Sequence, residues 1–398
     1  MTPTINPRIQ AIKLSGIRKI ANMLVDYPNA INLTVGQPDF PTPAKVKAAA
    51  VNAIAANKTG YTHNAGLLEL RHAASEYFNN KYGFTYDPQT EVLITAGASG
   101  GMDATFRTIL EEGDEIIVPA PIFAGYDPLI TLTGATAVYL DTTETNFIPD
   151  PTQLAALITP KTKAVVFSFP SNPTGVIIPH ETMDQLVDVV VKHDIFIVSD
   201  EIYSENTFKG THRSFAQYPQ LRSKLFLIHG LSKSHAMTGW RLGFLFASAE
   251  WMRHAVKAHA HNTICANAPA QHAAVVALTE CPNTPADMNK QYIKRRDLVY
   301  TRLTAMGLPT VKPNGAFYIF PSIKEFNMTS EQFAHTLLKE ADVAVVPGSA
   351  FTPIGEAYVR LSFANSYDQL EIAMDRIEEW IVYWRNNERH IVPDPPLM

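Results

Sequence analysis

The 398-residue sequence predicts an α/β protein with a large three-layer αβα domain, built on a mostly parallel sheet, and a smaller α+β domain. Two observations support this fold class. In the middle of the chain, short and nearly continuous apolar runs alternate with helical segments, which is typical of parallel strands covered on both faces. After Pro285 the pattern changes to longer helices and fewer strands. The chain is long enough for two or three domains with separate cores.

The first part of the chain predicts an N-terminal segment and two helices. Residues 1–43 contain several prolines and only short elements, and we expect them to pack with the small domain. The stretch Lys45–Asn57 is rich in alanine and lacks proline, which favours a helix. The stretch Gly66–Tyr82 has apolar residues at helical spacing and predicts a second helix.

The large domain is predicted to span residues 44–285. Apolar runs predict its strands, which are Glu91–Thr95, Glu115–Val118, Lys163–Phe169, Ile195–Ser199, Leu225–Ile228 and Leu242–Ala247. A helix is expected after the first of these strands, ending at Leu110, and another over Met183–His193.

The small domain is predicted to span residues 286–385. Its expected helices are Asp287–Met306, Ser330–Ala341 and Tyr367–Arg385, and its expected strands are Gly315–Pro321, Val343–Val346 and Tyr358–Phe363. Residues 386–398 contain three prolines and several polar groups, and we expect them to form a loose tail.

Composition and charge exclude several classes of function. A formal net charge of -5 gives no basic footprint for nucleic acid and no polybasic anchor for a membrane. No stretch approaches the ~20 apolar residues of a membrane span, and the first residues do not resemble a signal peptide. Cys265 and Cys281 are too few for a disulfide framework or a zinc cluster. We therefore expect a cytoplasmic protein without a nucleic-acid or membrane partner.

Histidine spacing gives no metal site. His254, His259 and His261 lack the spacing of a metal-binding pair on one helix face. We expect them to be surface or packing residues.

The central functional stretch of the sequence is Gly230–Arg241, a loop between two expected strands. Lys233 follows Ser232 directly, and Arg241 closes the loop. A hydroxyl and a guanidinium can together bind a phosphate. A lysine between them can form a Schiff base with a carbonyl if its amine is partly neutral. The alternative is a solvated loop with ordinary surface charges, which the flanking apolar runs make less favourable.

Three further signals follow expected strands of the same sheet. Gly97–Gly101 opens a helix, whose free N–H groups and dipole can bind an anion, although its glycine spacing is not that of a dinucleotide site. Phe123 is either a core residue or a residue that stacks on a flat aromatic cofactor. Asn172 either caps a turn or belongs to the site.

Two charged residues lie in or at the end of apolar strands. Asp200 closes one such strand, where a carboxylate is costly unless it is paired or solvated. A protonated pyridine nitrogen would pair with it, and Tyr203 would then reach the hydroxyl of the same ring. The alternative role for Asp200 is to cap a following helical turn. Arg360 lies inside Tyr358–Phe363 and needs a partner, for which a substrate carboxylate is well suited.

Together these motifs resemble those of the class I aminotransferases of the pyridoxal-phosphate fold-type I group, over nearly the whole chain. The motifs are Ser171–Gly175, Ser199–Tyr203, Leu231–Arg241 and Val359–Phe363. Three further stretches resemble the bacterial N-acetyl-LL-diaminopimelate aminotransferases and, next to these, the lactic-acid-bacterial aromatic aminotransferases: Ser15–Arg18, Gly36–Phe40 and Gly315–Pro321.

The resemblance implies pyridoxal 5′-phosphate as the cofactor and assigns residues to its ring. Lys233 would carry the internal aldimine and, once displaced by substrate, move the proton between Cα and the cofactor. Asp200 would keep the pyridine nitrogen protonated, so that the ring accepts electrons. Tyr203 and Asn172 would hydrogen-bond the ring oxygen, and Phe123 would stack on the ring.

The resemblance also assigns the phosphate and the substrate carboxylates. The residues expected at the phosphate are Ala98, Ser99, Ser232 and Arg241, with Tyr61 contributed by the partner subunit of a homodimer. Arg360, Asn172 and the backbone at Gly36 would bind the α-carboxylate. Arg18 is the candidate for the distal carboxylate of 2-oxoglutarate, and its alternative role is that of a surface arginine.

The predicted activity is a ping-pong transfer of the amino group of an L-amino acid to 2-oxoglutarate. N-acetyl-LL-diaminopimelate, which would place the enzyme in lysine biosynthesis, and aromatic amino acids are the expected donors. Ser99 stands where aspartate-type relatives often have lysine, which argues against a strong aspartate preference. Two alternatives stay open: a pyridoxal-phosphate β-eliminating lyase that releases pyruvate and ammonia, and a non-catalytic cofactor-binding regulator. Such a regulator usually carries a DNA-binding domain, for which we expect no room before Pro7.

Overall fold

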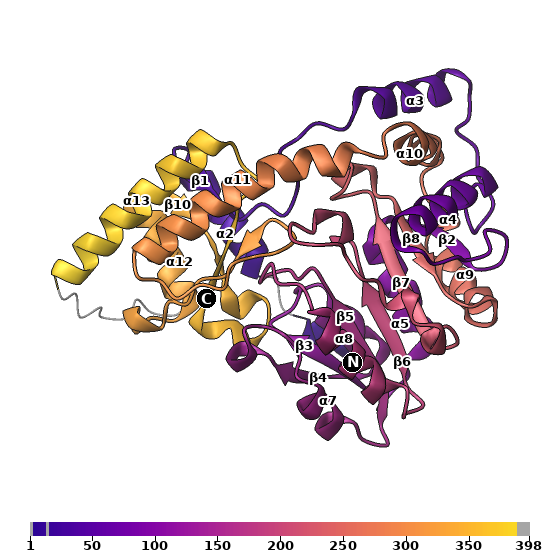
Figure 1. Cartoon of the computed structure of the whole chain (residues 1–398), viewed down its shortest axis with the longest axis horizontal. Coiled ribbons are helices and arrows are strands. Elements are labelled where there is room, and N and C mark those ends of the chain that lie inside the picture. The colour runs from indigo at the N-terminus through magenta and orange to yellow at the C-terminus, as the bar shows by residue number, and fades with distance from the viewer. Residues whose placement is uncertain (1–2, 13–15, 388–398) are drawn as a thin grey trace.

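The computed structural model describes residues 3–12 and 16–387, and it is built around a seven-stranded sheet (Figure 1). The strand order is β2-β8-β7-β6-β5-β3-β4, with β8 antiparallel to both neighbours and the other pairs parallel. The strands are β2 Val92–Thr95, β3 Glu115–Ala120, β4 Thr136–Asp141, β5 Thr162–Ser168, β6 Phe196–Asp200, β7 Leu225–Gly230 and β8 Gly243–Phe246. The mixed, mostly parallel α/β fold is therefore confirmed.

Both faces of this sheet are buried, as the nearly continuous apolar strands predict. On β5, Val165 and Phe167 belong to one hydrophobic core, while Ala164 and Val166 belong to the core on the opposite face. This alternation follows from the two-residue repeat of a strand. The helices that accompany the sheet are α3 Ala44–Ala55, α4 Leu68–Tyr82, α5 Gly97–Ile109, α6 Tyr126–Thr133, α7 Pro151–Leu157, α8 His180–Val190, α9 Ala249–Thr263 and α10 Ala268–Glu280.

A separate hydrophobic core joins the C-terminal helices to two small sheets (Figure 1). The three-stranded sheet has the order β11-β12-β9, and in the other sheet β1 and β10 pair in parallel. These strands are β1 Ile31–Asn32, β9 Tyr318–Ile319, β10 Val343–Ala344, β11 Val346–Pro347 and β12 Val359–Ser362. The helices are α11 Thr284–Ala305, α12 Ser330–Ala341 and α13 Tyr367–Asn386, with α1 Pro7–Ala11 and α2 Gly16–Met23 near the start of the chain.

Two expected strands differ from the structure. Val343–Val346 is divided at Val345, because β10 pairs with β1 whereas β11 pairs with β12. The expected strand Gly315–Pro321 shortens to β9, because Ala316 has a φ of 54° and turns the chain just before it. β4 was not expected at all, and its half-exposed positions lack the apolar run that marks the other strands.

The division into residues 1–43, 44–285, 286–385 and 386–398 remains a prediction. Residues 388–398 of the expected tail, and Ser15 of the motif Ser15–Arg18, lie outside the described residues.

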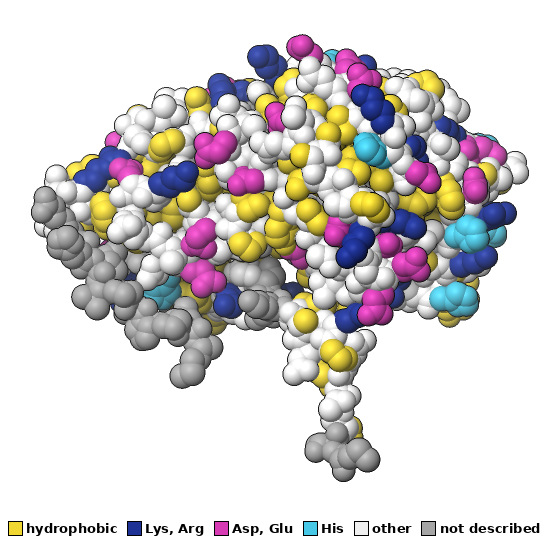
Figure 2. Space-filling view, turned by 90° about the horizontal axis from the view of Figure 1, so that it is seen from below, with side chains coloured by type: hydrophobic (Ala, Val, Ile, Leu, Met, Phe, Trp, Pro, Cys, Tyr) yellow, Lys and Arg dark blue, Asp and Glu magenta, His cyan; other side chains and the backbone are white. Residues whose placement is uncertain are grey.

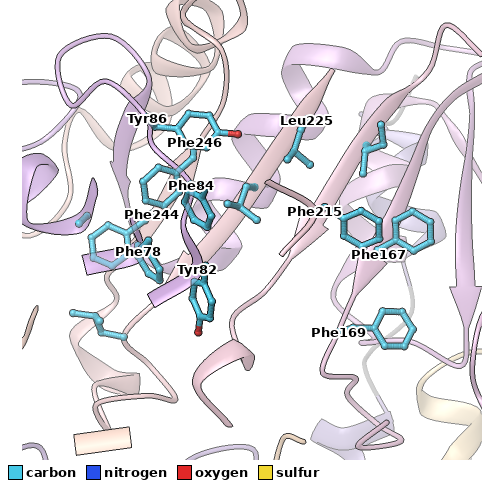
Figure 3. Close-up of a cluster of buried hydrophobic side chains, with 14 of the residues drawn as sticks. Phe78, Tyr82, Phe84, Tyr86, Phe167, Phe169, Phe215, Leu225, Phe244 and Phe246 are labelled. Atoms are coloured by element: carbon cyan, nitrogen blue, oxygen red, sulfur yellow. The ribbon is translucent and has the colours of Figure 1, made fainter. Parts of the chain in front are cut away.

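An aromatic cluster supports the strands that lead into the Lys233 loop (Figure 3). Phe78 of α4 packs edge-on against Phe244 and Phe246 of β8, with ring centroids 5.9 and 5.5 Å apart. His229 of β7 stacks on the same Phe78 ring at 4.1 Å. Large aromatic side chains packed in this way dominate the burial energy of a core, so the strand ends beside the loop are firmly held.

The face shown in Figure 2 mixes acidic and basic side chains, and the segment that leads to the N-terminus projects from the body. Within residues 3–12 and 16–387, no helix is both long enough and apolar enough to cross a membrane.

Candidate active site

A cavity of about 450 Å³ lies at the carboxyl ends of the parallel strands β5 and β6. This volume is within the ~300–1,000 Å³ typical of small-molecule sites. Of the residues expected to bind cofactor or substrate, all except Tyr61 and Arg18 line it: Gly36, Ala98, Ser99, Phe123, Asn172, Asp200, Tyr203, Ser232, Lys233, Arg241 and Arg360. Met102 and Tyr126, from a core of the large sheet, and Tyr203 and Tyr318, from the core of the C-terminal helices, line the same cavity.

Lys233 lies half-buried in the loop between β7 and β8. Its Nζ donates a hydrogen bond to the carbonyl oxygen of Gly36. Burial, with the positive charges of Arg360 and Arg241, lowers the pKa of Lys233 to about 7, while the charge of Asp200 opposes this shift. Much of the amine is therefore neutral near pH 7, which is the condition for a nucleophilic lysine.

Asp200, at the end of β6, has both carboxylate oxygens in hydrogen bonds and is 7% exposed. Oδ2 accepts from the Tyr126 hydroxyl at 2.5 Å, and Oδ1 accepts from the backbone N–H of Ile202 at 3.1 Å. Burial raises the pKa of Asp200, and these two hydrogen bonds lower it. Oδ1 thus serves the local turn, as the capping alternative suggested, while the carboxylate also lines the cavity.

Tyr203 and Tyr318 form a buried pair with their hydroxyl oxygens 2.7 Å apart. Both line the cavity, and the Tyr203 ring centroid lies 5.7 Å from Lys233 Nζ. Burial raises the pKa of both hydroxyls, so both remain protonated donors at neutral pH. Tyr318 was not among the expected site residues.

Arg360 of β12 is 2% exposed and has only part of its hydrogen-bonding capacity used. Nη1 donates to Asn172 Oδ1 at 2.9 Å, and Nη2 donates to the Thr34 carbonyl at 2.7 Å. Nε is buried and has no partner among the described residues. A guanidinium has five N–H donors, so Arg360 can still bind a carboxylate in the cavity. Asn172 is thus more than a turn residue, because it holds this guanidinium.

The start of α5 and Arg241 form a cradle for an anion. Ala98 and Ser99 lie in the first turn of α5, whose N-cap residue, Ala96, provides no side-chain hydrogen bond. Arg241 approaches so closely that a Cβ on Gly97 would lie 2.4 Å from its Nη2. Open N–H groups, the helix dipole and a guanidinium together favour a phosphate.

Phe123 and Ser232 complete the cavity wall. Phe123 is 37% exposed, and its ring meets Tyr126 edge-on at 5.6 Å, which places it in the cavity wall rather than in the core. Ser232 is 5% exposed and lies in the wall beside Lys233.

Two expected site residues lie outside the cavity. Tyr61 is 82% exposed, as a residue that reaches into a partner subunit would be. Arg18 is exposed on α2, while its neighbour Ile17 lines the cavity. The roles of Tyr61 and Arg18 remain predictions.

The histidines pack as expected or lie on the surface. His259 is buried and accepts a hydrogen bond from the N–H of Ala96, whereas His254 and His261 are exposed. Across the described ranges, no three His, Cys, Asp or Glu side chains are grouped so as to hold a metal ion.

The residues present fit pyridoxal 5′-phosphate. The cradle at Gly97 and Arg241 suits the phosphate, and the buried carboxylate of Asp200 suits a protonated ring nitrogen. Lys233 has the partly neutral amine that a carbonyl requires. The unpartnered Nε of Arg360 marks a second anion position in the same cavity, where a substrate carboxylate fits.

The polar residues of the cavity that sequence reasoning did not assign to the site are Thr34, Tyr126, Ser168, Thr238 and Tyr318. Ser168 ends β5, whose register with β6 brings it beside Asp200, and Thr34 follows β1 by two residues. Such positions offered a signal only once the strand order was known. Tyr126 begins α6 three residues after Phe123. Its closeness in sequence to an expected site residue was the one signal that it could belong to the site.

Comparison with known proteins agrees with this geometry. Residues 28–377 match the family described as aminotransferase class I and II. A probable N-acetyl-LL-diaminopimelate aminotransferase of Bacillus subtilis is 50% identical, over 96% of this chain and 97% of that protein. Aromatic-amino-acid aminotransferase 2 of Thermococcus litoralis is 40% identical, over 94% of this chain and 97% of that protein. The structure of aspartate aminotransferase from Thermus thermophilus with maleate is 34% identical, with a TM-score of 0.90 over 95% of this chain and 100% of that one.

Proposed function

The chain belongs to the class I and II aminotransferases, and from this premise we propose that it transfers the amino group of a long or aromatic L-amino acid to 2-oxoglutarate in a ping-pong cycle. N-acetyl-LL-diaminopimelate is the favoured donor, which would give the enzyme a role in lysine biosynthesis. The observation that carries the proposal is that Lys233, Asp200 and Arg360 line one cavity.

The enzyme depends on pyridoxal 5′-phosphate, as its family does. When bound, this cofactor supplies a carbonyl that reacts with amines and a pyridinium ring that accepts electrons. Asp200, held by Tyr126 and Ile202, would keep a proton on the ring nitrogen. Tyr203 and Asn172 would donate hydrogen bonds to the ring oxygen, and Phe123 would cover the ring. The start of α5, Ser232 and Arg241 would hold the phosphate.

Lys233 attaches the cofactor and then moves a proton. Its Nζ is poised by the Gly36 carbonyl, and its pKa of about 7 lets it accept and return a proton near neutral pH. With the cofactor bound, the Lys233 amine would be the group that accepts the proton of the substrate Cα and returns it. Arg360 orients the amino acid by its α-carboxylate, with Asn172 and the backbone at Gly36 as further contacts.

The cavity wall supports long or apolar donors. Ile17, Met102 and Leu129 contribute apolar side chains, and Ser99 places a hydroxyl rather than a cation at the start of α5. A short dicarboxylate such as aspartate therefore lacks a fixed cation at this position for its second carboxylate. We keep Arg18 on α2 as the candidate for the distal carboxylate of 2-oxoglutarate.

We also propose that the enzyme is a cytoplasmic homodimer with shared active sites. Support comes from large exposed apolar side chains, which a partner subunit would cover. Val51 and Ile54 on α3 are 63% and 55% exposed, and Tyr61, in the loop after α3, is 82% exposed. Both cysteines are free, which suits a reducing compartment. Sedimentation of the purified holoenzyme tests the assembly: a species of twice the chain mass is expected, and a monomer with full activity would contradict shared sites.

A donor panel tests the proposed specificity. Aspartate, phenylalanine and N-acetyl-LL-diaminopimelate are each incubated with 2-oxoglutarate, and both glutamate formation and pyruvate release are measured. We expect kcat/KM to be highest for the acetylated diaminopimelate and lowest for aspartate. Aspartate as the best donor would overturn the specificity. An amino acid with a thiol-linked β-substituent is tested beside them, and release of pyruvate from it without 2-oxoglutarate would favour the β-eliminating lyase.

A further inference from the structure

Tyr318 contacts both Tyr203 and Arg360 in the cavity. Its hydroxyl lies 2.7 Å from that of Tyr203, and its ring centroid lies 4.3 Å from the guanidinium carbon of Arg360. It is 1% exposed and lines the cavity, and a Cβ on Gly36 would lie 3.0 Å from its hydroxyl oxygen. One side chain thus contacts the residue expected at the cofactor's ring oxygen and the residue expected at the substrate's carboxylate.

The direction of the hydrogen bond between the two tyrosines follows from their proton count. Each hydroxyl has one proton to donate. If Tyr203 donates its proton to the ring oxygen of the cofactor, its own oxygen must accept from Tyr318. A donor that receives a hydrogen bond itself becomes a stronger donor, because successive hydrogen bonds polarise one another.

We propose that Tyr318 is a positioning residue with two separable actions. Its hydroxyl strengthens the hydrogen bond that Tyr203 donates to the cofactor, and its ring holds Arg360 in the orientation that binds a carboxylate. The inference rests on the proposed roles of Tyr203 and Arg360. Guanidinium–aromatic contact at this distance is favourable, above all in a desolvated site. The Phe351 ring also packs against this guanidinium, with its centroid 4.9 Å from the guanidinium carbon.

Two substitutions separate these actions. Tyr318→Phe removes only the hydroxyl, whereas Tyr318→Leu removes the ring as well. Tyr292→Phe is the matched control, because Tyr292 is equally buried, packs on Phe317 and has a hydroxyl without a partner among the described residues. It does not line the cavity.

The first readout is the pKa at which the absorbance of the bound cofactor changes. A hydrogen bond from Tyr203 stabilises the ionised ring oxygen, so weakening that bond raises this pKa. The charged groups that face the site, Lys233, Asp200, Arg241 and Arg360, are the same in every variant. We expect Tyr318→Phe to raise the pKa by about 10–30% of the rise caused by Tyr203→Phe, and Tyr292→Phe to leave it unchanged.

A double variant shows whether the hydroxyl acts through Tyr203. In the Tyr203→Phe background, Tyr318→Phe should cause no further shift. A wild-type absorbance pKa in Tyr318→Phe would overturn the first action, and so would an undiminished shift in the Tyr203→Phe background. A purely structural role would lower the melting temperature without moving the absorbance.

The second readout is the split between KM and kcat for the best donor of the panel. Tyr318→Phe should leave KM within about twofold, whereas Tyr318→Leu should raise it about two- to thirty-fold. Equal KM values in both variants would overturn the second action. If no donor is turned over by the wild type, the proposed function fails, and the absorbance titration still decides the first action. If Tyr318→Leu does not fold, Tyr318→Met takes its place with the same expected rise in KM.

Discussion

The hydroxyl of Tyr126 donates a hydrogen bond of 2.5 Å to Oδ2 of Asp200, and both side chains are buried. The Tyr126 oxygen also lies 3.0 Å from Ser168 Oγ, so Ser168 is left to donate to Tyr126. This chain of donors opposes the effect of burial, which raises the pKa of Asp200. It therefore favours the charged carboxylate, the form that pairs with a pyridinium nitrogen.

Tyr126→Phe should lower the rate per bound cofactor by roughly 10- to 100-fold, because a hydrogen bond to a charged group contributes about 1.5–3 kcal/mol. Asp200→Asn should lower it further, since the charge itself is lost. Cofactor retention and kcat are measured on the same samples. Tyr139→Phe is the control, because Tyr139 donates an equally short bond of 2.5 Å to Asp127, outside the cavity. An equal loss of rate in both tyrosine variants would contradict the role of Tyr126.

Attachment of pyridoxal 5′-phosphate to the cofactor-free enzyme should depend on pH with a midpoint near 7. Burial lowers the pKa of Lys233 to about 7 from its ordinary 10.5. Only the neutral amine is nucleophilic, so the rate should rise as the pH increases through 7 and level off above about 8. Stopped-flow absorbance between pH 5.5 and 10 measures it. A rate that still climbs above pH 9 would show an ordinary lysine.

Arg360→Lys should raise KM for donor and acceptor by roughly 10- to 100-fold, with a smaller change in kcat. An ammonium cannot form the two-bond fork, and it also leaves Asn172 and the Thr34 carbonyl without their donors. Steady-state kinetics with both substrates measure the effect. Arg302→Lys is the control, because Arg302 pairs with Asp375 and Glu378 away from the cavity. An unchanged KM in Arg360→Lys would place the α-carboxylate elsewhere.

Arg18→Ala should weaken the binding of 2-oxoglutarate more than that of phenylalanine, if α2 brings Arg18 to the distal carboxylate. Lys19→Ala is a matched control on the same helix, where Lys19 lies 3.8 Å from Glu331. KM values for 2-oxoglutarate in the two variants are compared. Equal values would leave Arg18 as a surface residue.

The strands and motif residues of the large sheet were predictable from sequence for a physical reason. A parallel strand buried on both faces must be apolar throughout, and a polar residue at its end must therefore have a specific partner. Asp200 and the Lys233 loop are such cases. Side chains whose role depends on strand order or on another element were not predictable. Tyr318 contacts Tyr203 from 115 residues away in the chain, and Tyr126 reaches Asp200 from α6.

Short strands set by pairing were also beyond sequence reasoning. Residues 343–347 form one apolar run, and only the pairing with β1 and β12 divides it into two strands. The separation of the site residues into cofactor and substrate contacts came from the family resemblance, because spacing alone does not assign a ligand to a side chain.

The most direct test of the central claim compares wild type with Lys233→Ala in the presence of an accepted amino donor and 2-oxoglutarate. Glutamate and the 2-oxo acid of the donor are quantified by mass spectrometry. The wild type should form them in equal amounts, and Lys233→Ala should form neither at a measurable rate while still binding the cofactor. Turnover close to wild type in Lys233→Ala, or borohydride fixing the cofactor to a peptide without Lys233, would contradict the account.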